Sequence, residues 1–159
     1  MRGTRILAVV FLLCGVNALQ LCVSAQTNNH HCNDRLIQGT YGFTIEGQKL
    51  AGPGPVGPQV GVAITTFDGE GNLSQLDSVV IGGSQVADFT HSPASGTYSV
   101  NGNCTGTFTI EFRDGRPPVT VDFVVVDDGR EIDTVVLPPQ GAVGPLATRS
   151  IGKRRFNQW

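Results

Sequence analysis

The sequence predicts an all-β fold, an antiparallel meander of about eight to nine strands closed into a small barrel, with a β-sandwich as the second choice. From Arg35 onward, apolar residues recur with a period of two or in short runs, and clusters of turn residues separate these runs. The 159 residues include 21 glycines, 9 prolines and 1 methionine, a composition poor in helix formers. Short turns join antiparallel neighbours, and closure removes the edges that a flat sheet would expose.

Turn residues mark where each of the first four expected strands ends and the next begins. In the first strand, Tyr41 and Phe43 alternate with small or polar residues, so one face is apolar. The second and third strands are joined by Asp68-Gly69-Glu70-Gly71-Asn72, whose glycines accept the positive φ that a hairpin turn requires. Gly82-Gly83 ends the third strand, and a weaker fourth strand follows.

The second half of the chain repeats this pattern of strands and tight turns. The segment Asn101–Thr105 separates the fifth and sixth strands, 113–118 the sixth and seventh, and Asp127–Gly129 the seventh and eighth. The strands define a barrel domain over residues 35–153, followed by a basic tail over 154–159. The expected strands cover residues 37–46, 59–67, 73–81, 85–90, 95–100, 106–113, 119–126, 130–137 and 146–153.

Residues 1–25 have the features of a cleaved signal peptide. Arg2 and Arg5 precede an apolar stretch over residues 6–16, and Val23-Ser24-Ala25 is the small-residue pattern that predicts cleavage after Ala25. No later segment reaches the roughly 20 apolar residues that a membrane-spanning helix needs. We therefore expect a secreted or periplasmic protein with no transmembrane segment in the mature chain.

Export would leave Cys32 and Cys104 as the two cysteines of the mature protein, in an oxidising compartment where a disulfide between them is expected. This bond would hold residues 26–34 as an N-terminal extension of the barrel. The competing interpretation makes Cys32 a metal ligand together with His30 and His31, but no fourth ligand lies nearby in the sequence. We expect no metal and no other cofactor.

The connection over residues 51–58, Ala-Gly-Pro-Gly-Pro-Val-Gly-Pro, cannot form a helix or a strand ladder. It is expected to run as a mobile, extended loop between the first two strands. The sequence leaves two interpretations open, because such a loop can be a plain surface connection or a lid over a cavity.

The charged residues argue against nucleic-acid binding and include weak candidates for acid–base catalysis. A formal net charge of −2, with no basic face, does not favour nucleic-acid binding. The candidate acid–base residues are Asp122, which alternates with valines in the seventh strand, Glu46, which ends the first strand beside the loop, and His91, whose ordinary pKa lies near neutral pH. Each can equally be a solvated surface residue.

Five aromatic residues are the candidate ligand-binding set. We expect their rings to form the wall of a lumen that binds a small apolar molecule, and the open alternative is that they fill a solid core. Two further residues, Asn72 and Asn103, match the N-glycosylation acceptor pattern, which matters only in a eukaryotic secretory pathway. The aromatic candidates are Tyr41, Phe43, Phe108, Phe112 and Phe123.

Several segments resemble the recurring blocks of an uncharacterised family of small exported β-rich proteins of soil bacteria, and the resemblance implies a bacterial, exported protein. The meander is also loosely similar to calycin-like and allene-oxide-cyclase-like barrels, which enclose an apolar cavity, although the Gly-x-Trp opening of lipocalins is absent. The blocks are Gly39-Thr40-Tyr41-Gly42-Phe43, Asp68–Leu73, Gly96-Thr97-Tyr98, Asn103–Thr107 and Phe123–Ile132.

Three functions follow as hypotheses. The leading one is a non-enzymatic exported barrel that binds a small apolar ligand. The second is a cyclase or isomerase of the same barrel shape, which needs a buried acid such as Asp122 or Glu46. The third is a ligand-free surface or structural protein that attaches through the basic segment Arg149–Trp159. The sequence leaves the oligomeric state open.

Overall fold

A computed structural model describes residues 31–113, 115–138 and 144–155 of the chain. The expected signal peptide and its cleavage site after Ala25 lie outside the described residues, as do residues 156–159 of the expected basic tail. Among the described residues, no helix has the length and apolar character needed to cross a membrane.

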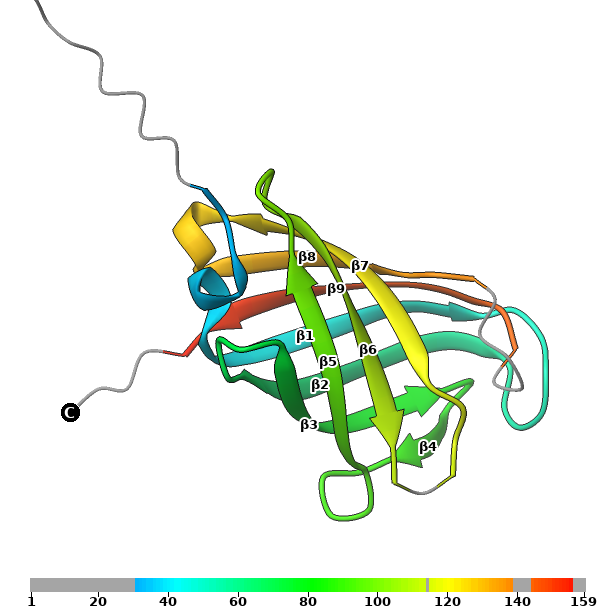
Figure 1. Ribbon diagram of the computed structural model, residues 1–159. Helices are drawn as coiled ribbons and strands as arrows, with labels where there is room; N and C mark the ends of the chain where they lie inside the picture. Colours follow the sequence, from blue (N-terminus) through cyan, green and yellow to red (C-terminus); the bar gives the residue numbers. More distant parts are fainter. Residues whose placement is uncertain (1–30, 114, 139–143, 156–159) are drawn as a thin grey trace, which may run out of the picture.

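The described residues form a closed antiparallel barrel of eight strands with one additional strand, as the sequence predicts (Figure 1). Each barrel strand pairs with the next barrel strand along the chain. The short β4 is not part of the barrel, so β3 pairs directly with β5, and β9 pairs with β1 to close the barrel. The elements are η1 (Asp34–Ile37), β1 (Gly39–Lys49), β2 (Gly57–Phe67), β3 (Asn72–Ile81), β4 (Ser84–Ala87), β5 (Pro93–Val100), β6 (Thr105–Phe112), β7 (Val119–Val126), η2 (Asp127–Gly129), β8 (Glu131–Val136) and β9 (Leu146–Arg154).

The ends of the chain depart from the expected boundaries. The first strand begins two residues later than predicted because η1 occupies the preceding segment, where the side chain of Asn33 accepts a hydrogen bond from the backbone N–H of Arg35. It also continues past Glu46 to Lys49, in register with β2 and β9. Arg154, expected as the first residue of a tail, is the last residue of β9.

The predicted fourth strand is shorter than expected, and a side chain explains its end. The carboxylate of Asp88 accepts hydrogen bonds from the backbone N–H groups of Thr90 and His91, so the chain turns where a strand was expected. The strand β4 pairs with the last residues of β3, beyond the part of β3 that pairs with β5. A register shift between Val79 and Val80 accommodates this change of partner.

One end of the barrel is filled by a packed core beneath η1, at the left of Figure 1. The side chains of Ile37, Tyr41 and Ile132 are fully buried there, and Phe67 is 1% exposed. The ring of Phe67 lies at the centre of this core, with ring centroids 5.6 Å from Tyr41, 4.9 Å from Tyr98 and 6.1 Å from Phe108. Edge-to-face contacts of this kind add to the burial energy of large rings.

Hydrogen bonds from two tyrosines connect the packed end to the surrounding segments. The hydroxyl of Tyr41 donates to the carbonyl of Gly129 and accepts from the Nε and Nη2 atoms of Arg154 at 3.0 and 2.7 Å. The hydroxyl of Tyr98 accepts from the backbone N–H of Gly69 at 2.8 Å and donates to the carbonyl of Asp34 at 3.2 Å. These bonds join η1, β1, β5, β9 and two turns.

The predicted disulfide between Cys32 and Cys104 is present, with Cα atoms 5.0 Å apart. It attaches the segment before η1 to the turn between β5 and β6, and Cys32 is buried. The competing role of Cys32 as a metal ligand is therefore wrong for this state of the protein, because the thiolate that a metal requires is used in the bond.

Both tyrosines of the chain, Tyr41 and Tyr98, are expected to ionise at unusually high pH. Burial favours the neutral phenol and raises the pKa of each above its ordinary value of 10.0, and the Arg154 guanidinium only partly offsets this for Tyr41. The unfolded chain therefore loses these protons first, so this contribution to stability is present below pH 10 and is lost as pH rises further. Ultraviolet titration of tyrosinate should show no transition at the ordinary pKa in the folded protein. A normal transition before unfolding would contradict the burial.

Candidate functional site

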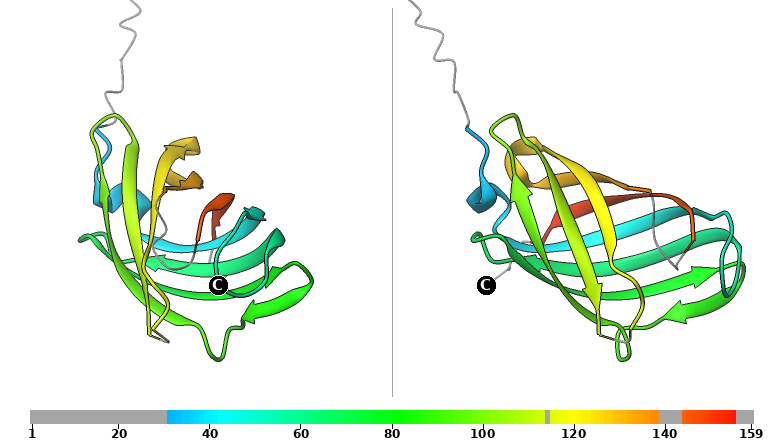
Figure 2. Two further views of the ribbon diagram at one scale, coloured as in Figure 1. Left: turned by 90° about the vertical axis from the view of Figure 1, so that its right-hand side faces the viewer. Right: turned by 45° about the vertical axis from the view of Figure 1, so that its right-hand side comes forward.

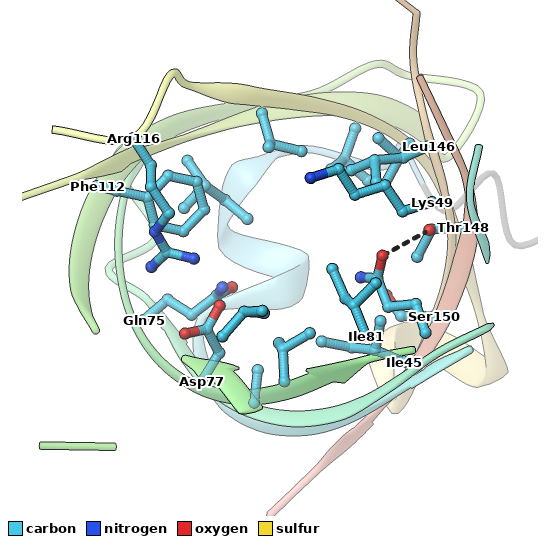
Figure 3. A pocket seen from close by; sticks show the side chains of 18 of the residues that line it. Ile45, Lys49, Gln75, Asp77, Ile81, Phe112, Arg116, Leu146, Thr148 and Ser150 are labelled. Carbon is cyan, nitrogen blue, oxygen red and sulfur yellow. Dashed lines mark hydrogen bonds between the residues drawn. The ribbon is translucent and has the colours of Figure 1, made fainter. Parts of the chain in front are cut away.

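The half of the barrel beyond the packed core contains a cavity of about 450 Å³ (Figure 3). Most of its wall is aliphatic or aromatic, with polar side chains on two sides. The residues that line it are Phe43, Ile45, Lys49, Pro53, Gly54, Pro55, Gln59, Ala63, Gln75, Asp77, Val79, Ile81, Val86, Phe108, Ile110, Phe112, Arg116, Pro117, Val119, Val121, Thr134, Val136, Leu146, Thr148 and Ser150.

Strand register decides which side chains face the cavity. Residues directly opposite one another in an antiparallel pair share a face of the sheet, and Phe43 lies opposite Ala63, which lies opposite Asp77. The inward position of Phe43 therefore places Asp77 in the lumen. In the same way, the Tyr41–Thr65 pair brings Gln75 to the inner face next to the packed half.

The five predicted aromatic residues all belong to the buried core cluster or pack against it, and three of them also line the cavity. Phe43, Phe108 and Phe112 line the cavity. Tyr41 and Phe123 belong to the packed core and are not among the cavity-lining residues. A hollow interior and a packed core are thus both present, and ligand binding by these rings stays a prediction.

One polar side of the cavity contains Gln75, Asp77 and Arg116, none of which the sequence analysis singled out (Figure 3). Asp77 is 5% exposed and Gln75 is 8% exposed. The guanidinium of Arg116 lies over the ring of Phe112, 4.0 Å from its centroid, and points toward the same part of the cavity. The alternation of β3 gives no signal for Gln75 and Asp77, because its outer face is also partly apolar, with Leu76 39% exposed.

The other polar side lies around Lys49 and Thr148 (Figure 3). The hydroxyl of Thr148 donates to the Oε1 atom of Gln59 over 3.4 Å, and all three side chains are buried. The ammonium of Lys49 donates to the backbone carbonyl of Pro53. Lys49 thereby joins the end of β1 to the Gly/Pro connection.

The Gly/Pro connection lies at the cavity. Its residues Pro53, Gly54 and Pro55 form part of the lining, which is the placement that the lid interpretation requires. At its base, the backbone N–H of Leu50 donates to the carbonyl of Pro145 at 2.9 Å. The prediction that residues 51–58 form no strand is wrong for Gly57 and Pro58, which begin β2 and pair with Lys49 and Gln48 of β1. The expected mobility of the connection stays a prediction.

The three acid–base candidates lie outside the cavity. Asp122 is on the outer face of β7, beside a shallow surface groove that also contains Asp133. Glu46 is on the outer face of β1 and pairs with Arg149 at 3.3 Å, with 64% of its side chain exposed. The structure therefore brings no two of the three candidates together, and neither Asp122 nor Glu46 is the buried acid that the cyclase hypothesis needs.

The third candidate, His91, belongs to the turn after β4, and 82% of its side chain is exposed. Its Nδ1 atom lies 2.9 Å from both carboxylate oxygens of Asp88. The hydrogen bond from His91, together with those from backbone N–H groups, lowers the pKa of Asp88 to about 2. The hydrogen bonds between Asp88 and His91 thus stabilise the turn itself.

The basic residues near the C-terminus are engaged in the barrel as far as the structure describes them. Arg149 pairs with Glu46, Lys153 pairs with Glu131 at 3.5 Å, and Arg154 bonds to Tyr41. The side chains of Arg149 and Lys153 nevertheless stay 69% and 76% exposed, and Arg155 is bound to the sheet through its backbone N–H alone. Surface attachment through this segment stays a prediction.

Comparisons of the chain with protein-family models, with curated protein sequences and with solved structures gave no match.

Proposed function

We propose that the protein binds a small, mainly apolar molecule in the open half of its barrel. The observation that carries this proposal is the cavity of about 450 Å³, which lies within the size range of small-molecule sites and has an apolar wall with a few polar groups. A barrel that needed only a solid core could fill this half as it fills the other. The chain instead places small side chains, such as Ala63, on the inner face there.

The first experiment looks for a bound molecule. The full-length chain, expressed for export into an oxidising compartment of its host, would be purified and examined by native mass spectrometry. We expect a small molecule at fixed stoichiometry with the protein. An apo mass, together with no thermal stabilisation by any member of an apolar compound library, would overturn the proposal, because a ligand that binds only the folded state must raise its stability.

A pair of neighbouring valines gives a sharper prediction, since consecutive strand residues point to opposite faces. Val136 lines the cavity, whereas Val135 is 50% exposed on the outer face. Val136→Trp should fill the cavity and lower ligand affinity at least about tenfold. Val135→Trp adds the same ring outside and should leave affinity unchanged, as measured by calorimetric titration with the ligand found above. Equal affinities in the two variants would place the ligand elsewhere.

A second candidate function is isomerisation or cyclisation of the bound molecule, favoured by the buried carboxyl of Asp77 in the cavity. A carboxyl at such a position is a suitable proton donor or acceptor for an apolar substrate. The test incubates the protein with the purified ligand and separates isomeric products by chromatography. Products formed by the parent protein and the Asp122→Asn variant, but not by Asp77→Asn, would support it. Product formation that survives Asp77→Asn would remove it.

A further inference from the structure

The amide of Gln75 is a neutral polar group in the cavity wall. Gln75 is 8% exposed, and its Oε1 atom accepts a hydrogen bond at 2.9 Å from the hydroxyl of Thr65, which is 1% exposed. In this arrangement Oε1 is the occupied end of the amide. The Nε2 atom has no hydrogen bond to any other residue in the described part of the chain, so the group that Gln75 offers to a ligand is a donor.

The position of Gln75 determines which part of a ligand it would meet. Its pairing partner on β2 is Thr65, which in turn lies opposite Tyr41 of β1 in the packed core. Gln75 therefore borders the packed half on its β2 side and, through Ala94, is in register with Phe112 on its other side. A ligand group that reaches this amide also comes close to the Arg116 guanidinium, which lies over the Phe112 ring.

The charges beside Gln75 limit the chemistry of the ligand group that meets its amide. Asp77 and Arg116 line the same side of the cavity and carry opposite formal charges (Figure 3). Because these two charges offset one another, the site offers no net charge to a carboxylate or an ammonium, and either would lose its hydration without a full compensating interaction. A neutral acceptor avoids both penalties and satisfies the Nε2 donor.

We infer that the ligand carries a neutral carbonyl oxygen, as in a ketone, ester or quinone, which accepts a hydrogen bond from Nε2 of Gln75 while the rest of the molecule lies against the apolar wall formed by residues such as Phe43, Phe108 and Val121. This inference rests on the proposed ligand-binding function and specifies its ligand class. A buried donor rejects a hydrocarbon of the same shape, because without the carbonyl the donor stays unsatisfied.

Three tricyclic probes of closely similar shape test the inference on the full-length protein: fluorene, 9-fluorenone and fluorene-9-carboxylate. One added hydrogen bond should make fluorenone bind roughly five- to tenfold more tightly than fluorene, and the carboxylate should bind more weakly than fluorenone. Equilibrium dialysis measures all three affinities. Equal binding of fluorene and fluorenone, or tightest binding of the carboxylate, would overturn the inference while leaving the proposed function intact. Binding of none of the three, combined with an apo mass, would count against the proposed function itself.

The outer face of the barrel supplies a control of the same residue type, because Gln48 of β1 is exposed and does not line the cavity. Gln75→Leu should abolish the preference for fluorenone, whereas Gln48→Leu should preserve it. The reverse result would overturn the assignment to Gln75.

A spectroscopic readout on the parent protein makes the test independent of how the variants fold. The side-chain amide resonances of Gln75 should shift on addition of fluorenone and not on addition of fluorene. Those of Gln48, on the outer face of β1, should shift with neither. Absence of the fluorenone-specific shift in Gln75 would contradict the inference.

Discussion

Replacing Phe67 with alanine is expected to lower the free energy of unfolding by about 3 to 5 kcal/mol, the range found when large core aromatics are truncated. Phe67 is 1% exposed and its ring contacts those of Tyr41, Tyr98 and Phe108, so the truncation leaves a void that these rigid neighbours cannot fill. Truncation also removes three aromatic contacts at once. Urea denaturation followed by far-ultraviolet circular dichroism measures the change in the free energy of unfolding.

Phe89 provides the control of the same residue type. It lies in the turn between β4 and β5 and is 46% exposed, so Phe89→Ala should change the free energy of unfolding by less than about 0.5 kcal/mol. If both variants lost similar stability, the packed core would not be centred on Phe67.

Removing the disulfide should have an effect of similar size through a different mechanism. Cys32 and Cys104 are separated by 72 residues, and a bond that closes a loop of that length restricts the unfolded chain by about 4 kcal/mol. The Cys32→Ala/Cys104→Ala double variant should therefore be less stable by about this amount. Its measurement uses denaturant titration of the oxidised parent protein and the variant.

Ligand affinity serves as a control for the disulfide variant. Neither Cys32 nor Cys104 lines the cavity, so the double variant should keep its ligand affinity under conditions in which it is folded. A stability loss below about 1 kcal/mol would instead mean that other contacts already hold the N-terminal segment. One such contact is the hydrogen bond at 2.7 Å from the backbone N–H of Val100 to the carboxylate of Asp34.

The position of Asp77 shows how a cavity-lining carboxyl can lack a signal in the sequence. Asp122 stands out in the sequence because it interrupts a run of valines, yet it lies on the outer face. Asp77 alternates with Gln75 and Val79 on the inner face, where its neighbours Leu76 and Ser78 on the other face give no contrast in polarity. A polar residue in a cavity wall weakens the very alternation by which inner faces are recognised.

In the second strand, too, the pattern of polarity does not reveal which face is the inner one. Val60, Val62 and Ile64 form its most hydrophobic alternation, and polarity by itself would place them inside. They are instead 56%, 46% and 38% exposed, while Gln59 and Thr65 face the lumen. The register with β1 decides this, because Ala63 must share a face with its partner Phe43.

The amino-acid sequence by itself determined the all-β class, the positions of the strands and turns, the closed meander and the Cys32–Cys104 bond. These features depend on local backbone preferences, on spacing and on the number of cysteines, all of which are properties of neighbouring residues or of composition. Cleavage after Ala25, export and the resemblance to exported bacterial β-proteins and calycin-like barrels stay predictions.

Only the tertiary structure decided that one half of the barrel is packed and the other half hollow, and which polar residues face the hollow. A shift of one residue in register exchanges the two faces of a strand, and the volume left inside depends on side chains that eight strands contribute together. Phe43 lines the cavity and Tyr41 fills the core although they are two residues apart on the same face, because their heights along the barrel differ. No pattern within a single strand carries that information.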